Sequence, residues 1–234
     1  MAGVAVDLHI HSCLSPCGDE LMTPNNIVRM SALKGLELIA VTDHNTARQL
    51  PAVEKVCRKV GMGLLPGLEL TTREEAHLLA YFLTVADALA FSEYIYPHLP
   101  KIKNRPDFFG EQWVLDDQDE RVGGEELLLI NALDLSIDQL TEQIRAFHGL
   151  PVPAHINRGG NGLLNALGFL PPNLQFAALE VTRGIACPHT PDIAAYRHLH
   201  ASDAHQLDAI AEREYFLPLA EPSAAAFFQY LTNQ

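Results

Sequence analysis

Seven short apolar runs, separated for the most part by helix-like segments, limit how this chain can fold. The runs are Val4–His9, Leu36–Thr42, Gly63–Leu70, His77–Thr84, Val152–His155, Phe176–Thr182 and Leu199–Asp203. Between them, residues 23–35 begin with Thr23 as a helix N-cap, and residues 136–149 begin with Ser136 in a capping box. Strands that alternate with helices in this way predict an α/β fold built on a parallel sheet or barrel.

Size and composition indicate one globular domain, residues 1–234, because a chain of that length can bury a sizeable core. Hydrophobic residues make up 48%, yet no apolar stretch reaches the roughly 18 residues of a membrane helix. The chain enters directly on a strand pattern with no basic leader, and four cysteines are too few for a disulfide framework. We therefore expect a cytoplasmic, reduced protein with no membrane partner.

The charge of the chain bears on nucleic-acid binding. Its formal net charge is −13, whereas long duplexes are usually bound by clustered Lys and Arg side chains. We therefore expect no binding of a long duplex, although a short nucleic-acid end can still reach a local site.

Residues 101–131 interrupt the alternation of strands and helices. They contain the only Trp of the chain, several charged residues and paired glycines. Trp113–Leu115 leads into an acidic turn, which favours a small inserted hairpin lobe. A long surface loop is the alternative.

Histidine and acidic side chains stand at the ends of five of the runs. The carboxyl ends of parallel strands meet on one face of a barrel or sheet, where active sites lie. One such histidine alone is more readily explained as a structural hydrogen-bonding residue, but the set predicts a metal centre. Its members are His9, His11, Asp43, His44, Glu69, His155, Asp203 and His205.

His77 begins a run instead of ending one. Only seven residues separate it from Glu69, too few for a helical crossover but enough for a hairpin turn. We therefore expect the run from His77 to lie antiparallel to the preceding run. This course places His77 on the same face as Glu69.

Strand alternation sorts the other polar candidates. Residues i and i+2 of a strand point the same way, so His9 and His11 can reach one ion. Asp7 shares their face and is expected either to accept the second N–H of a ligand histidine or to make a buried polar contact. The histidines expected to lie away from the centre are His98, His148, His189, His198 and His200.

The ordered motifs "DLHIHS", "AVTDHN", "GLEL", "HLLAYF", "PAHINR" and "SDAH", from residue 6 to residue 205, resemble those of the PHP (polymerase and histidinol phosphatase) superfamily. The resemblance implies a distorted (β/α)7 barrel with two or three divalent metal ions at its C-terminal face. It also implies the hydrolysis of phosphate esters. The seven predicted runs agree with that number of strands.

The resemblance implies three metal subsites. The first is formed by His9, His11, Glu69 and Asp203. The second is formed by Glu69, as a bridging ligand, with His77 and His155. The third combines His44 and His205 with a residue that follows the first motif.

The identity of that last residue is open. Many relatives have an acidic residue five places after the second histidine, where this chain has Pro16. We expect Asp19 to serve as the ligand, ahead of Cys17, with Glu20 third.

The ligand types fit manganese, iron or zinc without distinguishing among them. Two such ions about 3.5–4 Å apart can activate water and clamp a phosphate. The expected catalytic residues are Glu69 as the bridge and Asp203 or His205 as the group that passes a proton to the leaving oxygen. Arg158 is expected to bind a phosphate oxygen, with a surface role as its alternative, and Arg183 is a weaker second candidate.

These features predict a phosphoesterase that acts on a phosphomonoester, a cyclic nucleotide phosphate or an oligonucleotide end. Two other functions stay open. One is a regulatory module that has lost its chemistry, against which the near-complete ligand set argues. The other is an exonuclease or accessory domain of the polymerase-associated kind. The sequence does not predict an oligomeric state.

Overall fold

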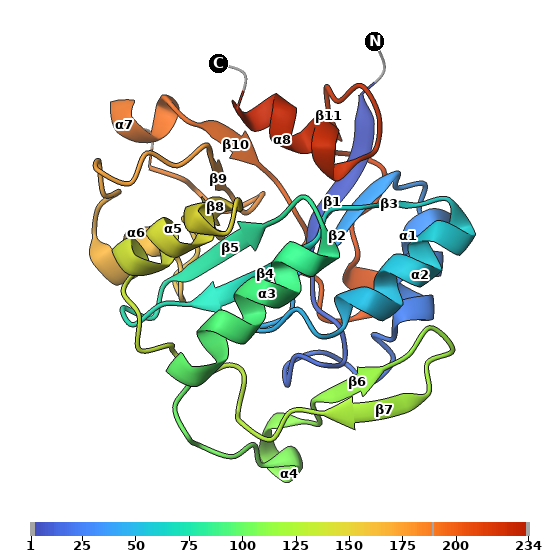
Figure 1. Ribbon diagram of the computed structural model, residues 1–234. Helices are drawn as coiled ribbons and strands as arrows, with labels where there is room; N and C mark the ends of the chain where they lie inside the picture. The colour runs from blue at the N-terminus through green and yellow to red at the C-terminus, as the bar shows by residue number, and fades with distance from the viewer. Residues whose placement is uncertain (1–2, 189, 233–234) are drawn as a thin grey trace.

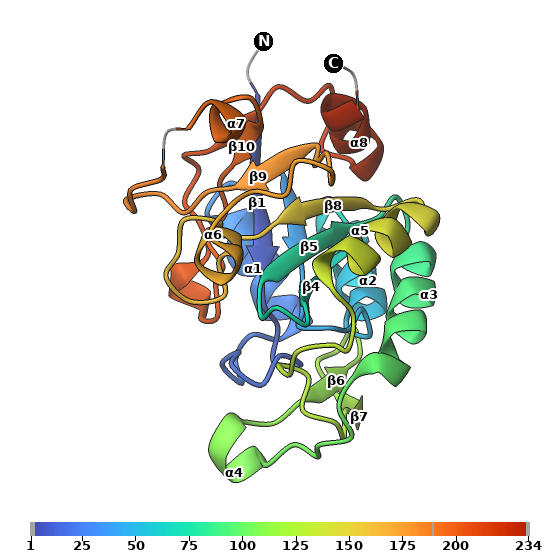
Figure 2. The ribbon, with the colours of Figure 1, turned by 90° about the vertical axis from the view of Figure 1, so that its left-hand side faces the viewer.

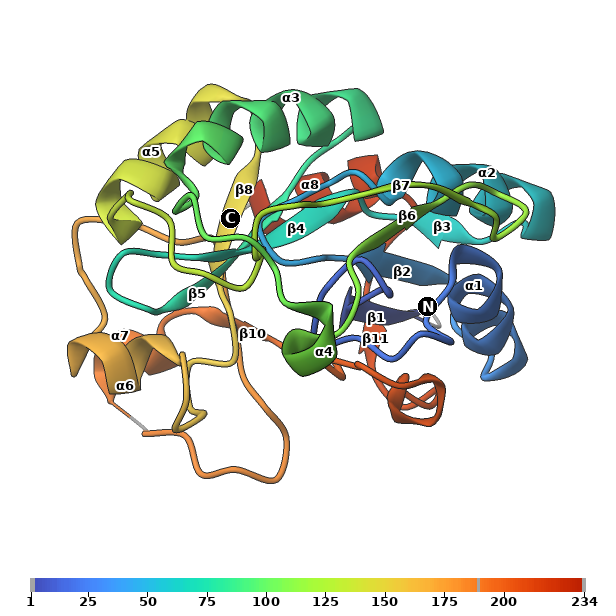
Figure 3. The same ribbon diagram turned by 90° about the horizontal axis from the view of Figure 1, so that it is seen from below.

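The computed structural model describes residues 3–188 and 190–232. Its strands are β1 (Val4–Ile10), β2 (Leu38–Val41), β3 (Gly63–Leu64), β4 (Gly67–Thr71), β5 (His77–Tyr81), β6 (Trp113–Leu115), β7 (Arg121–Gly124), β8 (Leu150–Pro153), β9 (Ala178–Glu180), β10 (Arg197–Leu199) and β11 (Phe216–Leu217). Its α-helices are α1 (Pro24–Leu33), α2 (Leu50–Val60), α3 (Val85–Ile95), α4 (Pro106–Phe109), α5 (Ile137–Ala146), α6 (Leu163–Leu167), α7 (Pro191–Ala194) and α8 (Ala224–Thr232). The strands lie in the middle of the molecule, and α1, α2, α3 and α5 pack outside them (Figures 1 and 3). Within these residues, no helix is both long and apolar enough to cross a membrane.

The strands pair in four sheets. β1, β2 and β3 are parallel neighbours, and β11 is antiparallel to β1. β9 and β10 form a parallel pair, and β5 lies between β4 and β8, antiparallel to both. Between the described residues, this pairing does not close into a continuous barrel. The α/β class is therefore confirmed, whereas the closure of a (β/α)7 barrel is not.

The predicted runs overlap the observed strands, with one division. The run Gly63–Leu70 is split into β3 and β4, and Pro66 lies at the break, where it has no N–H to donate to a neighbouring strand. The antiparallel course expected after Glu69 is confirmed, because Thr71 pairs with His77 in the β4–β5 register.

Backbone contacts join the separate sheets at the face where the predicted ligands lie. A parallel bridge links His44 with Glu69, so the end of β2 meets β4. A second parallel bridge links Ile10 with Ala204, and the N–H of His11 donates to the carbonyl of Ala204 at 2.9 Å. Strand ends from different sheets are thereby held side by side.

The opposite end of the strands is closed by α8. Phe227 of this helix is fully buried and packs edge-on against Tyr81, with the ring centroids 5.5 Å apart. The hydroxyl of Tyr81 donates to the carbonyl of Leu8 at 2.8 Å. Burial of side chains of this size stabilises the fold by about 1.5–3 kcal/mol each. This end forms core, and only the other end is left for a functional site.

The lobe, residues 101–131, contains the β6–β7 hairpin and α4, and the predicted hairpin is confirmed. It lies below the strands in Figures 1 and 2. Asp119 in its turn accepts a hydrogen bond from the hydroxyl of Thr23, the N-cap of α1. The side-chain amide of Gln49, just before α2, bonds to both the N–H and the carbonyl of Leu115. The lobe is therefore anchored to the starts of two helices.

Candidate metal centre

The carboxylate of Glu69 lies inside a ring of imidazoles. The side chain is 1% exposed, in the middle of β4. One nitrogen from each of five histidines approaches its oxygens: His9 at 3.4 Å, His11 at 3.3 Å, His44 at 3.2 Å, His77 at 2.8 Å and His155 at 3.1 Å. These histidines come from β1 and its end, the end of β2, the start of β5 and the end of β8. Residues far apart in the sequence are thus brought to one carboxylate.

His9 and His11 point at the same spot, with their Nε2 atoms 3.1 Å apart. Oδ1 of Asp203 lies 3.3 Å from Nε2 of His9 and 3.1 Å from Nε2 of His11. Together with Glu69, these residues offer ligand atoms that all lie within 4.8 Å of one another. This is the set expected for the first subsite.

The outer nitrogens of these two histidines have partners of their own. Nδ1–H of His9 donates to the carboxylate of Glu180 at 3.0 Å. Nδ1–H of His11 donates to the hydroxyl of Ser15 at 3.0 Å, and that hydroxyl donates to Asp43 at 2.7 Å. The outer contacts therefore leave Nε2 of each ring as the nitrogen that faces the centre.

Glu180 is the site residue that the sequence interpretation missed. It ends β9 and also accepts the backbone N–H of His155 at 3.2 Å. Its position, a carboxylate at a strand end, is the same signal that selected Asp203. Asp7 accepts hydrogen bonds from Ser202 and from the N–H of Ala211, so it makes the buried polar contact and not the histidine contact.

Asp19, the residue expected for the third subsite, is not among the clustered residues that the structure describes. Its carboxylate accepts the N–H of Leu21 at 2.8 Å in an exposed turn, and its own N–H donates to the carbonyl of His205 at 2.9 Å. A ligand atom of Cys17 lies instead within 4.8 Å of ligand atoms of His11, His44 and His205. Glu20 is exposed and belongs to no such group within the described residues.

Arg158 and Arg183 occupy different surroundings. Nη1 of Arg158 is hydrogen-bonded to Oδ2 of Asp203, so the guanidinium reaches the centre through one of its carboxylates. Arg183 lies over the ring of Tyr215, 5.3 Å from its centroid, and 3.8 Å from Glu214. Arg158 therefore contacts the cluster, whereas Arg183 contacts Tyr215 and Glu214.

Two residues of the centre adopt a backbone conformation that favours glycine. His155 has a φ of 27° and Asp203 a φ of 53°. Holding a residue other than glycine in this conformation costs about 1–3 kcal/mol of folding free energy. Residues held in this way are found mainly at functional sites, where the surrounding structure keeps them in place. Both lie just past a strand end, where their backbone turns toward the centre.

The donor atoms fit metal ions. Nδ1 of His44, Nδ1 of His77 and Oδ1 of Asp203 are buried without a hydrogen bond, although Glu69 lies near the two nitrogens. Leaving a buried polar atom unpaired costs about 1–3 kcal/mol, so such atoms are rare. Divalent transition-metal ions accept imidazole and carboxylate ligands of this kind and would satisfy them.

Burial and charge oppose each other in the centre. Burial alone would raise the pKa of Glu69, but the histidines around it hold this pKa well below its ordinary value. Burial alone would lower the pKa of His9, but the surrounding carboxylates raise it well above its ordinary value. Burial is likewise outweighed at His11, where Asp203 and Glu69 raise the pKa to about 9. In the metal-free centre the surrounding carboxylates therefore favour the protonated form of His9 and of His11.

We expect metal uptake by the metal-free protein to release protons and to tighten as the pH rises. Because its pKa is raised from 6.5 to about 9, His11 is mainly in its doubly protonated form between these two pH values, and the extra proton competes with the metal. Each displaced proton changes the affinity about tenfold per pH unit, and the gain ends above the raised pKa. Calorimetric titration in buffers of different ionisation enthalpy counts the protons. Affinity that is independent of pH in this window, with no proton release, contradicts the expectation.

The remaining histidines lie away from the centre. His198 and His200 are each hydrogen-bonded to a backbone carbonyl, and His98 contacts an aromatic ring. His148 follows α5, and His189 lies outside the described residues.

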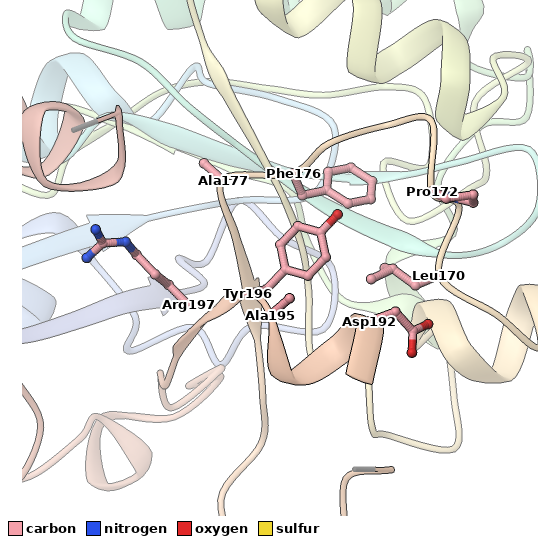
Figure 4. A pocket seen from close by; sticks show the side chains of 8 residues that line it. All are labelled: Leu170, Pro172, Phe176, Ala177, Asp192, Ala195, Tyr196 and Arg197. Carbon is pink, nitrogen blue, oxygen red and sulfur yellow. The ribbon is translucent and has the colours of Figure 1, made fainter. Parts of the chain in front are cut away.

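A cavity of about 670 Å³ lies beside α7 and β10, apart from the centre. Figure 4 shows the side chains that line it: Leu170, Pro172, Phe176, Ala177, Asp192, Ala195, Tyr196 and Arg197. No residue of the metal centre is among them. We therefore do not assign this cavity to the substrate of the centre.

Comparison with known proteins identifies the family. The sequence model of the PHP domain matches residues 7–142, more than half of the chain, which include His9, His11, His44, Glu69 and His77. The chain belongs to the PHP domain family. Members of the PHP family are metal-dependent hydrolases that include phosphoesterases and nucleases.

Curated relatives match one part of this PHP chain. An uncharacterized protein of Methanocaldococcus jannaschii is 34% identical over 85 residues, which are 33% of this chain and 49% of that protein. The 5'-3' exoribonuclease Rnm of Salmonella typhimurium is 34% identical over 76 residues, 32% of this chain and 25% of that enzyme. Each match covers less than half of the relative's own length.

Solved structures share the PHP fold over nearly the whole chain. The lesion-specific endonuclease EndoQ of Pyrococcus furiosus is 18% identical with a TM-score of 0.66, and the match covers 98% of this chain and 56% of that one. A protein of Bifidobacterium adolescentis assigned as a metal-dependent phosphoesterase is 18% identical with a TM-score of 0.61, over 97% and 96% of the two chains. Endonuclease Q has also been solved with a 27-mer duplex, so the expected absence of long-duplex binding finds no support in the fold.

Proposed function

We propose that this PHP chain hydrolyses phosphate esters at the Glu69-centred cluster. The observation that best supports this function is that the buried carboxylate of Glu69 lies within 3.4 Å of a nitrogen from each of five histidines. We also propose that residues 1–234 form a single domain that acts in the cytoplasm. We treat the separate sheets as sectors of a distorted (β/α)7 barrel, since their ends meet at this cluster.

The clustered residues divide into subsites that share Glu69. We assign His9, His11, Glu69 and Asp203 to one ion, and Glu69, His77 and His155 to a second. His44 and His205 remain for a third ion. When bound, divalent ions such as manganese, iron or zinc activate water and offset negative charge on the phosphate oxygens.

Asp203 and His205 have the same possible roles in this proposal. Burial raises the pKa of Asp203, but His9 and His11 outweigh it and hold this pKa below its ordinary value. Burial, and then the positive charge of His11, lower the pKa of His205. At neutral pH Asp203 is therefore ionised and His205 is neutral, with its one N–H on Nδ1. Both suit binding metal or accepting a proton from water, and neither suits protonating the leaving oxygen.

Arg158 positions one carboxylate and faces solvent with the rest of its head group. Its side chain is 37% exposed, while the side chain of Asp203, its partner, is 7% exposed. A guanidinium offers five N–H donors, so the bond to Asp203 leaves donors for a non-bridging phosphate oxygen. We propose that Arg158 binds the phosphate in this way.

Arg158→Ala should leave the metal content unchanged and lower kcat/KM for a phosphate ester by roughly 10–100-fold, as expected for a lost charge-assisted hydrogen bond. Arg158→Lys should recover only part of the loss, because an ammonium group cannot bond through two donors at once. Arg183→Ala is the control, since Arg183 lies over Tyr215, and should change little. If the metal content of Arg158→Ala falls together with its activity, Arg158 only positions Asp203 and does not bind the phosphate.

The lobe favours a nucleic-acid end over a small phosphomonoester. Phe108 is 70% exposed, and the guanidinium of Arg105 lies 5.2 Å from its ring centroid. A methyl group on Gly110, just past the end of α4, would lie 2.7 Å from the carbonyl oxygen of Pro16, so the end of the helix that carries Phe108 lies beside the loop that carries Cys17. Exposed aromatic rings with neighbouring cations stack on the bases of single strands. The similarity to a 5'-3' exoribonuclease supports the same substrate class.

The proposal is tested by metal analysis and a substrate panel. Protein purified without chelator is analysed for metals, then loaded separately with manganese, iron and zinc. Turnover is measured on p-nitrophenyl phosphate, bis-p-nitrophenyl phosphate, and 5'-phosphorylated single-stranded and duplex oligonucleotides. We expect two or three ions per chain and preference for single-stranded ends. If the protein binds two or more ions but hydrolyses none of these substrates, the proposed hydrolysis is wrong and a regulatory module becomes the better explanation.

A further inference from the structure

The loop after β1, residues 11–18, carries a sulfur ligand into the centre. Ligand atoms of Cys17, His11, His44 and His205 all lie within 4.8 Å of one another. The nearest carboxylate in the sequence, Asp19, is turned to the surface, where it bonds to Leu21. The position that faces the two histidines of the third subsite is therefore filled by a thiol.

Backbone bonds determine this placement. The N–H of Ser15 donates to the carbonyl of Ser12, and the N–H of Gly18 donates to the carbonyl of Ser15, so the loop folds back on itself. A methyl group on Gly18 would lie 2.2 Å from the carbonyl oxygen of Ser12, a contact that only glycine avoids. The N–H of Asp19 then donates to the carbonyl of His205, which draws Cys17 toward that histidine.

The histidines beside Cys17 have nitrogens available for an ion. Nδ1 of His44 has no hydrogen bond, and the side chain is 4% exposed. Nδ1–H of His205 donates to the carbonyl of Asp203 at 2.8 Å, which leaves Nε2 free. The ring of His11 stacks on that of His205, with the centroids 4.2 Å apart, and is tilted against that of His44, with the centroids 4.5 Å apart. The buried Nδ1 of His44, unpaired although it lies 3.2 Å from Glu69, is an independent sign that a ligand belongs in this part of the centre.

We propose that Cys17 is a ligand of the third subsite, together with His44 and His205, and that this subsite selects zinc over manganese. The inference rests on the metal centre of the proposed function. Thiolate with imidazole is a zinc-type donor set, whereas oxygen-rich sets suit manganese. On binding, the thiol loses its proton to solvent as the sulfur–metal bond forms, with no change of oxidation state. The Glu69-bridged pair, which has no sulfur, takes its metals without this preference.

Cobalt(II) replaces zinc in such sites and reports a sulfur ligand by a thiolate-to-metal absorption band in the near ultraviolet. The metal-free full-length protein is titrated with cobalt(II), and zinc stoichiometry is measured in parallel. The wild type should show the band and bind one more zinc ion than Cys17→Ser, in which the band is lost. Because Cys17 is exposed, this substitution leaves the core intact. Cys187→Ser is the control thiol and should keep both the band and the stoichiometry.

Cys17→Asp gives a second readout that does not depend on activity. It restores a carboxylate, so the third ion should bind again, without the band and with manganese now competing against zinc. Cobalt bound by the wild type without the band, or a band that persists in Cys17→Ser, overturns the role of Cys17 while the metal centre stands. Absence of any bound cobalt or zinc overturns this inference and the proposed function together.

Discussion

Glu69→Gln should empty two metal subsites at once and lower kcat/KM by roughly a thousandfold or more, on the scale of lost preorganised electrostatic groups. The carboxylate contacts all five histidines of the ring, so no neighbouring side chain can take its place. A neutral amide of the same size can offer a metal only one oxygen, and its NH2 group points a donor at the imidazoles. Metal content by elemental analysis and turnover under metal-replete conditions check this result.

The matched control for Glu69 is Glu75→Gln. Glu75 is exposed in the turn between β4 and β5, a few residues from the same centre. This variant should bind metal and turn over substrate like the wild type. If Glu69→Gln retains its full metal content and activity, the bridging role assigned to this carboxylate is wrong.

Glu180→Gln should weaken metal binding about 10–100-fold, the usual effect of removing a group that orients a metal ligand. Glu180 accepts Nδ1–H of His9 and the backbone N–H of His155. A glutamine amide that turns its NH2 toward Nδ1 favours the tautomer with hydrogen on Nε2, the nitrogen that faces the centre. Loss of the carboxylate charge also removes one of the causes that raise the pKa of His9.

Competition with a chelator of known affinity measures the effect of Glu180→Gln. Nitrogen-detected NMR of the metal-free protein should show His9 losing a proton at a lower pH than in the wild type and keeping the remaining proton on Nε2, which a merely structural role would not produce. Glu37→Gln is the control, because Glu37 accepts the N–H of Ala5 near the start of β1, far from the strand end that carries His9. If the metal affinity of Glu180→Gln is unchanged, Glu180 does not orient His9 for the metal and only makes an ordinary buried hydrogen bond.

The strand-end residues of the centre could be selected without a structure. Strand alternation is local, so the shared direction of His9 and His11 follows from their spacing. The short gap between Glu69 and His77 likewise limits the chain to a hairpin, whatever surrounds it. The structure places these four residues in one cluster.

Sequence by itself determined which side chains stand at strand ends, and only the tertiary structure decided which of them meet. His9 and Glu180 are 171 residues apart, so strand order in space, not spacing, gives His9 this partner in place of Asp7. Cys17 faces the centre and Asp19 does not, because the loop is closed by a backbone bond to His205, far along the chain. Alternation and turn length are properties of neighbouring residues, whereas these contacts depend on how distant strands are packed together.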